Sequence, residues 1–110
     1  MRLPNGDQAS LDIRKLEDCC LDPDHPRGKH KARVFRDALG LSRKDANWLR
    51  QALLAAADGD SATQFGTDDF GTRWRIDTSL ARQDRVVVIR SLWIVRTGEQ
   101  NPRFVTCWVL

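Results

Sequence analysis

The stretch RVVVIRSLWIVRT, residues 85–97, is rich in β-branched and aromatic side chains, which favour extended backbone. It therefore predicts a long strand. The stretch before it, FGTRWRIDTSL (70–80), alternates between two sets of side chains, as a half-buried strand does. The last stretch, RFVTCWVL (103–110), has a similar composition, and short polar turns separate the three. We expect an antiparallel meander, with SATQFGT (61–67) as a weaker fourth strand.

The chain before residue 61 carries helical periodicity. A short helix is predicted over residues 13–20, where apolar residues recur at helical spacing before a proline-rich stop. A second helix is predicted over residues 29–39 and ends at Gly40, which suits a left-handed cap. The third, over residues 42–59, opens with a Ser-x-x-Asp capping pattern. The fold class expected is α+β, with three N-terminal helices packed on a three- to four-stranded antiparallel sheet in a single domain, residues 1–110.

Charge is segregated along the chain, although the net charge is only +3. Residues 27–50 hold 8 lysines and arginines against 2 acidic residues, and residues 73–110 hold 7 against 3. The intervening blocks, 1–26 and 51–72, are acidic. If the two basic blocks meet in the fold, they form a positive face able to attract phosphates. A solvated surface of mixed charge is the alternative.

Several classes of protein are disfavoured by composition. The polar opening MRLPNGDQAS and the absence of a long apolar run predict a cytoplasmic protein with no membrane segment. The three cysteines, Cys19, Cys20 and Cys107, form no disulfide framework and are expected to be reduced packing thiols. Neither histidine stands at a metal-ligand spacing, so we expect no metal and no cofactor.

The start of the predicted helix 29–39 combines unusual features. A helical wheel places Lys31 within the apolar arc and His30 at its border, next to Val34. A lysine facing a core must reach a partner, extend its ammonium to solvent, or serve a site. Cations at a helix N-terminus are mildly unfavourable, so their presence indicates an anion-binding role. His30 as an ordinary surface histidine remains an alternative, and His25, in a turn, is interpreted as structural.

Arginines occur within the predicted strands. Arg73 and Arg75 share one face of their strand, and Arg90 and Arg96 share one face of theirs. Arginine forks bind phosphates in bidentate fashion, but cross-strand ion pairs would give the same pattern. Which face the helices cover is not determined by the pattern. Four tryptophans lie among apolar neighbours and are interpreted as core residues, with base-stacking platforms as the alternative: Trp48, Trp74, Trp93 and Trp108.

Three segments carry a resemblance that runs almost from end to end: LPN, KLEDCCLDPDHPRGKHKARVF with ALGL, and SLWIVRTGEQNPRFVTCWVL. They resemble a small bacterial domain family of unknown function, found as stand-alone proteins and as C-terminal modules of toxins. Its helices-then-sheet layout looks like the barnase/EndoU/colicin/RelE-like ribonuclease fold, which implies RNA cleavage without a metal ion.

The resemblance implies roles for particular residues. His30 would act as base or acid, Lys31 and Arg90 would stabilise the charged phosphorane, and the Thr106 hydroxyl would hydrogen-bond the scissile phosphate. Four arginines would bind neighbouring phosphates: Arg33, Arg73, Arg75 and Arg96. Trp108 stands where the resembling pattern often has tyrosine, so no phenol acts there.

We therefore expect an RNA-cleaving toxin domain that acts on RNA such as tRNA or rRNA. An acidic antitoxin or immunity protein would cover its basic cleft. A module that binds RNA or a protein through the same basic face without cleaving it is the competing hypothesis. A purely structural or antitoxin-like role is the third.

Overall fold

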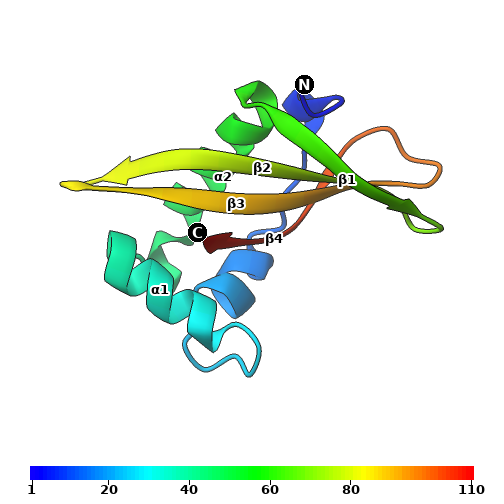
Figure 1. Cartoon of the computed structure of the whole chain (residues 1–110). Helices are drawn as coiled ribbons and strands as arrows, with labels where there is room; N and C mark the ends of the chain where they lie inside the picture. The colour runs from blue at the N-terminus through cyan, green and yellow to red at the C-terminus, as the bar shows by residue number, and fades with distance from the viewer.

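The computed structural model describes all residues, 1–110, as an α+β fold in which the strands follow the helices along the chain (Figure 1). The sheet is antiparallel, in the order β1 (Ala62–Asp68), β2 (Gly71–Arg82), β3 (Arg85–Arg96), β4 (Arg103–Val109). All four predicted strands are present, including the weak first one. β2 and β3 form a long hairpin whose tip holds Gln83 with a positive φ of 56°.

Two α-helices precede the sheet. α1 (Lys29–Leu39) has the predicted bounds and ends at Gly40, where φ is 67°. The predicted helix 42–59 begins as a 3-10 turn, η3 (Arg43–Asp45), and continues as α2 (Ala46–Gly59). Its capping pattern is confirmed, because the Asp45 carboxylate accepts the backbone N–H of Ser42 at 2.9 Å.

The expected arrangement of three N-terminal helices on the sheet is wrong. Only two α-helices exist, and neither is N-terminal, because the first begins at Lys29. The segment before it holds a 3-10 turn, η1 (Gly6–Gln8), and a five-residue π-helix, η2 (Leu16–Cys20). The π-helix buries Leu16 and Cys20 at its two ends, and the proline-rich segment follows it. A longer helix is therefore not needed to fill this side of the core. The N-terminal segment also pairs with strand ends, through bridges from Arg2 to Ser61 and from Ser10 to Arg103.

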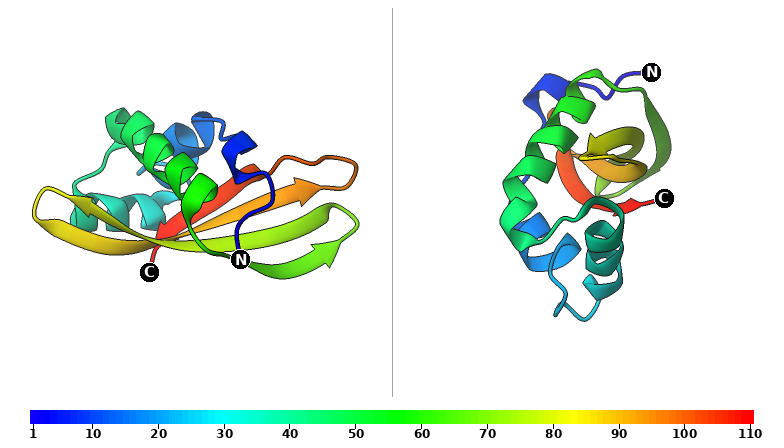
Figure 2. Two further views of the ribbon diagram at one scale, coloured as in Figure 1. Left: turned by 90° about the horizontal axis from the view of Figure 1, so that it is seen from above. Right: turned by 90° about the vertical axis from the view of Figure 1, so that its left-hand side faces the viewer.

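The helices cover one side of the sheet (Figure 2). α1 packs on β4 and β3, whereas α2 packs on β2. The sheet residues of the core alternate along their strands: Trp74, Ile76, Ile89, Trp93 and Phe104. Their neighbours in sequence therefore point to the other side. No helix is long and apolar enough to cross a membrane.

The position of α1 is fixed at Gly28, the residue just before its first turn. Gly28 is buried there, and a Cβ at this position would overlap the carbonyl oxygen of Cys19, so only glycine fits. The His25 Nδ1 atom accepts hydrogen bonds from the backbone N–H groups of Arg27 and Gly28, at 3.0 and 2.8 Å. His25 thus closes the turn before the helix, as its structural interpretation predicts.

Replacing His25 by alanine is expected to lower the free energy of unfolding by about 1–2 kcal/mol, because two backbone donors lose their acceptor. His25→Asn keeps an acceptor at a similar reach and should recover most of the loss. Urea unfolding followed by tryptophan fluorescence measures both variants. Equal stability of His25→Ala and the parent chain would show that the imidazole does not hold this turn.

Candidate functional site

Lys31 reaches from the first turn of α1 to β4. The residue is half-buried, and its ammonium donates a hydrogen bond to the Thr106 hydroxyl at 2.9 Å and lies 5.4 Å from the centre of the Trp108 ring. An ammonium has three N–H donors, so two are left without a protein partner. Lys31 forms no ion pair with a carboxylate. A half-buried cation without a carboxylate partner is well suited to bind an anion.

Thr106 and Trp108 lie on the sheet face that the core does not use. In the register, Thr106 is opposite Leu92 and Trp108 is opposite Arg90, and both of these point away from the buried Trp93 side. Arg75 is opposite Leu92 on the neighbouring strand. These five residues define what we call the open face. α1 packs beside β4, the last strand of the sheet, so Lys31 meets the open face at its border.

Trp108 stands between two hollows. The first, of about 450 Å³, is lined by His30, Lys31, Val34, Trp108 and Val109. The second, of about 220 Å³, is lined by Phe65, Arg75, Arg90, Leu92 and Trp108. The predicted catalytic residues are thus grouped around one indole, with His30 and Lys31 on one side and Arg90 on the other. We call this group, with Thr106, the Lys31 site.

His30 lies in the first hollow but is held loosely. Its side chain is exposed, and no hydrogen bond joins it to another residue. Val34, one helical turn further on, is 43% exposed beside it, although the wheel assigned it to the core. The reason is that the apolar arc of α1 is wider than the surface it covers, so its edge borders the hollow instead of the core.

Arg90 is already engaged by a carboxylate. Its guanidinium donates two hydrogen bonds to Asp77, at 2.8 and 2.9 Å, across the β2–β3 pair. These bonds hold the pKa of Asp77 below its usual value, so the pair is charged at neutral pH. The ion-pair alternative for the strand arginines is therefore realised at Arg90. A phosphate at this position would share the guanidinium with Asp77.

The four arginines predicted to bind phosphates are not all brought together. Arg75 lines the second hollow and has no hydrogen-bond or ion-pair partner, so it is available to a ligand. Arg73 donates to Asp68 at 3.3 Å. Arg73 and Arg96 line another hollow, further along the sheet. Arg33 is two residues from Lys31, so it points about 200° around α1, away from the open face.

Two cysteines lie beneath the Lys31 site. Cys20 and Cys107 are both buried, and the Cys20 sulfur is 3.6 Å from the Thr106 hydroxyl oxygen. The thiol and backbone of Cys107 lower the pKa of Cys20 to about 6, against the opposing effect of burial. The pKa of Cys107 is raised well above the ordinary thiol value. The two thiols therefore interact directly with each other beneath the Thr106 hydroxyl.

Sequence reasoning missed part of this site. Trp74 and Trp93 are core residues as predicted, but Trp48 is 36% exposed and Trp108 is only partly buried. The alternation of β4 carried a usable signal, because Thr106 and Trp108 are two residues apart and must share a face. Leu92 had the same signal, because it is two residues from Arg90 on one strand. Phe65 had none, and it joins the site through strand pairing, which a single sequence does not specify.

The molecule presents no group of three or more His, Cys, Asp and Glu side chains placed to hold a metal ion. The lysine and arginine side chains of the site, by contrast, can form charge-assisted hydrogen bonds with phosphate or carboxylate ligands. The open face therefore has the chemistry of an anion-binding surface.

The fold and site define an α+β domain with helices on one side of an antiparallel sheet and a basic, aromatic site on the other. The chain belongs to a family described as Domain of unknown function (DUF6883), whose model matches residues 2–110. A comparison with functionally curated proteins gives no match.

Among the solved structures that match, one shares the fold over most of the chain. It is a chain of the "Contact-dependent growth inhibition toxin - immunity protein complex from Klebsiella pneumoniae 342", with a TM-score of 0.70 and 13% sequence identity. The match covers 91% of this chain and 98% of that chain. At this identity the likeness establishes the fold alone. The resemblance to the barnase/EndoU/colicin/RelE-like fold stays a prediction.

Replacing Lys31 by methionine is expected to change the free energy of unfolding by less than about 1 kcal/mol. One hydrogen bond and one cation–π contact are lost, each worth about 1 kcal/mol or less, and an apolar chain of similar length still covers the indole. Urea unfolding measures the change. A loss above about 2 kcal/mol would make Lys31 a structural residue, since a ligand-binding lysine has no such role in the free protein.

Proposed function

We propose that this chain is a toxin domain that cleaves RNA at the Lys31 site without a metal ion. The observation that carries the proposal is the contact between the Lys31 ammonium and the Thr106 hydroxyl, 2.9 Å apart, beside the Trp108 ring. It places a cation, a hydroxyl and a stacking surface at one point, next to an exposed imidazole. Phosphate, ribose and base each find a complementary group there.

The chemistry requires few groups. The ribose 2′-oxygen loses its proton to a base, attacks phosphorus, and displaces the 5′-oxygen, which takes up a proton as the bond breaks. The products are a 2′,3′-cyclic phosphate and a free 5′-hydroxyl. His30 is the candidate base or acid, because its exposed imidazole lines the same hollow as Lys31. Lys31 stabilises the phosphorane charge, and Thr106 holds a phosphate oxygen.

The second hollow positions the rest of the strand. A base stacked on Trp108 leaves the neighbouring phosphate near Arg75, whose guanidinium is unpaired, and near Arg90, which is shared with Asp77. Arg73 and Arg96 lie further along the same face and extend the path for phosphates. Because base stacking is sequence-tolerant, this arrangement favours single-stranded RNA of varied sequence at the cleavage point.

The proposed biological role is supported by a neighbour of the same fold. The neighbour of the same fold belongs to a complex of a growth inhibition toxin with its immunity protein. A domain of this kind that cleaves RNA would act in the cytoplasm on tRNA or rRNA, and its producer would need an antitoxin or immunity protein. We propose that this partner is acidic and covers the open face, since the site is cationic.

A non-catalytic RNA-binding module is the second candidate. The observation in its favour is that His30 is the one histidine near the site and is held by no hydrogen bond, so no oriented acid/base pair is formed. The same arginines and Trp108 would still bind single-stranded RNA. Cleavage products separate the two candidates directly.

Cleavage is tested with purified protein, tRNA and ribosomal RNA in excess chelator. The parent chain should yield fragments ending in 2′,3′-cyclic phosphate. Lys31→Met and His30→Ala should each lower the single-turnover rate by about 100-fold or more, through loss of charge stabilisation and of proton transfer. Thr106→Val should lower it by about tenfold, the cost of one hydrogen bond.

The matched control is Arg2→Gln, which removes an exposed cation that lines neither hollow and should cleave at the parent rate. Intact RNA from folded parent protein would refute the cleavage proposal and leave the binding module. Equal cleavage by all four variants would indicate a contaminating nuclease.

Asp77→Asn is expected to raise affinity for single-stranded RNA about threefold to tenfold, because Arg90 no longer shares its guanidinium with a carboxylate. The slope of log Kd against log salt should steepen by about 0.7, the value for one additional phosphate contact. Fluorescence anisotropy measures both quantities. Asp58→Asn removes an equal charge from the exposed surface of α2. If both variants gain the same affinity, Arg90 makes no contact with RNA.

A further inference from the structure

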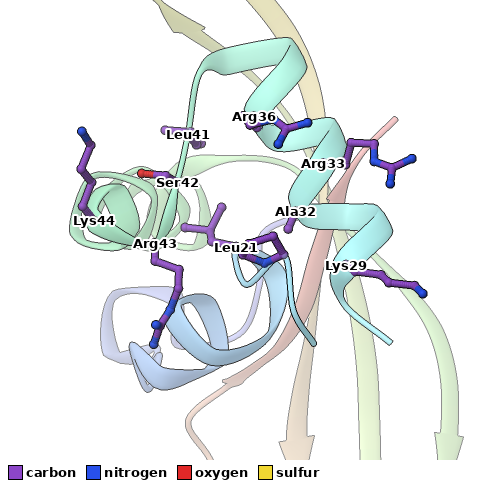
Figure 3. A pocket seen from close by; sticks show the side chains of 10 residues that line it. Leu21, Lys29, Ala32, Arg33, Arg36, Leu41, Ser42, Arg43 and Lys44 are labelled. Atoms are coloured by element: carbon purple, nitrogen blue, oxygen red, sulfur yellow. The ribbon is translucent and has the colours of Figure 1, made fainter. Parts of the chain in front are cut away.

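A second basic surface lies on the helical side of the molecule. It is a groove of about 450 Å³ between α1 and the segment around η3 (Figure 3). Figure 3 shows Lys29, Arg33 and Arg36 along α1, with Arg43 and Lys44 on the facing segment. The groove has five cationic side chains in its lining and no acidic one. We call it the α1–η3 groove.

The α1–η3 groove is separate from the Lys31 site, although both use α1. Lys29 and Arg33 are each two residues from Lys31, and this spacing turns them about 200° around the helix axis. Along the helix, Lys29, Arg33 and Arg36 follow one another at intervals of about 6 and 4.5 Å, so they form a row on one side. The two hollows beside Trp108 include none of these three residues.

Most of this positive charge is not neutralised. Arg43 pairs with Asp18 at 2.8 Å, and Arg36 has a longer contact with Asp37, at 3.4 Å. Lys29, Arg33 and Lys44 have no hydrogen-bond or ion-pair partner. They are also exposed, so they are not needed to fill the core. Three free cations around one groove weaken the fold slightly by mutual repulsion, and this cost is offset when an anionic ligand binds.

The floor of the groove argues against a protein ligand. Three of its apolar members, Leu21, Ala32 and Leu41, are at most 4% exposed, so they are already covered by the molecule itself, and Pro23 is the one exposed apolar residue. Protein interfaces depend on apolar and aromatic anchors at their centre and are depleted in lysine. Nucleic-acid affinity, by contrast, comes mainly from neutralising phosphates with lysine and arginine. The groove has the composition of a nucleic-acid-binding surface.

We propose that the α1–η3 groove is a second phosphate-binding surface that holds a part of the RNA remote from the Lys31 site. The proposal rests on the proposed function, since it assumes that RNA is the ligand of this domain. It implies that the preferred RNA is long or folded enough to place phosphates on both sides of α1. A short single strand fills the Lys31 site without touching the groove.

The test compares two uncleavable probes, a long 2′-O-methyl RNA hairpin and a 2′-O-methyl trinucleotide, in fluorescence anisotropy. Neither has a free 2′-hydroxyl, so binding is measured whether or not the protein cleaves RNA. The triple variant Lys29→Gln, Arg33→Gln, Lys44→Gln should bind the hairpin about tenfold to hundredfold more weakly. Its slope of log Kd against log salt should fall by about 2, and its affinity for the trinucleotide should match that of the parent chain.

Arg33→Gln alone is compared with Arg2→Gln, which removes an equal exposed charge outside both surfaces. Only the first should weaken hairpin binding. Circular dichroism confirms that the variants fold, which is expected because none of the substituted side chains is buried.

Several results would overturn the proposal. If the triple variant binds the hairpin as tightly as the parent chain, the groove does not hold RNA, whether or not the chain cleaves RNA. If it loses equal affinity for both probes, its charges act only by general attraction. If it binds both probes normally but loses an acidic protein partner, the groove is a protein-docking surface. Selective loss of hairpin binding in a chain that cleaves nothing would support the groove and refute only the cleavage.

Discussion

The burial of Trp93 is the constraint on which the sheet and its basic face depend. Its side chain is fully buried, its indole N–H donates to the Ser91 hydroxyl at 2.9 Å, and its ring packs edge-on against Phe104. Because successive residues of a strand point to opposite faces, fixing Trp93 inward fixes Arg90 and Leu92 outward. A slip of one residue would bury Arg90 and expose the indole, at a cost of several kcal/mol. The positive open face is thus a consequence of core packing.

The strand pattern predicted the existence of β3 but not its orientation. The face that carries Arg90 also carries Val86, Val88 and Leu92, so by hydrophobicity it rivals the face of Ser91 and Trp93. In the structure, the size of the side chains and the pairing of the strands decide which face of β3 is buried. Trp93 lies opposite Trp74, and both fill the space under the helices, whereas Val86 is 70% exposed on the hairpin tip. Volume matching across elements decides such cases, and a single strand pattern does not contain it.

The helical region shows a similar division. α1 could be predicted to the residue because glycines bound it and its apolar arc is clear. The first predicted helix, residues 13–20, is present over residues 14–20, but it is mainly a π-helix, because its apolar spacing, 13, 16 and 20, fits a wide turn as well as an α-helix. At the candidate site, the signal in the sequence was the position of a charged residue, Lys31, within the apolar arc of α1. Its partners Thr106 and Trp108 are more than seventy residues away, so only the strand order brings them together.

The two basic blocks of the sequence do meet, but they do not merge into one face. α1 separates them: Lys31 reaches Thr106 on the sheet, whereas Lys29 and Arg33 lie on the other side of the helix and line the α1–η3 groove. A helix with its side chains is about 10 Å across, which is close to the screening length at physiological salt. Charges on its two sides therefore reinforce one another only for a ligand that lies against the helix itself. A polyanion bent around the N-terminus of α1 gains from both surfaces, whereas a small anion gains from one. The modest net charge of +3 thus gives little indication of how strongly an extended polyanion would be bound.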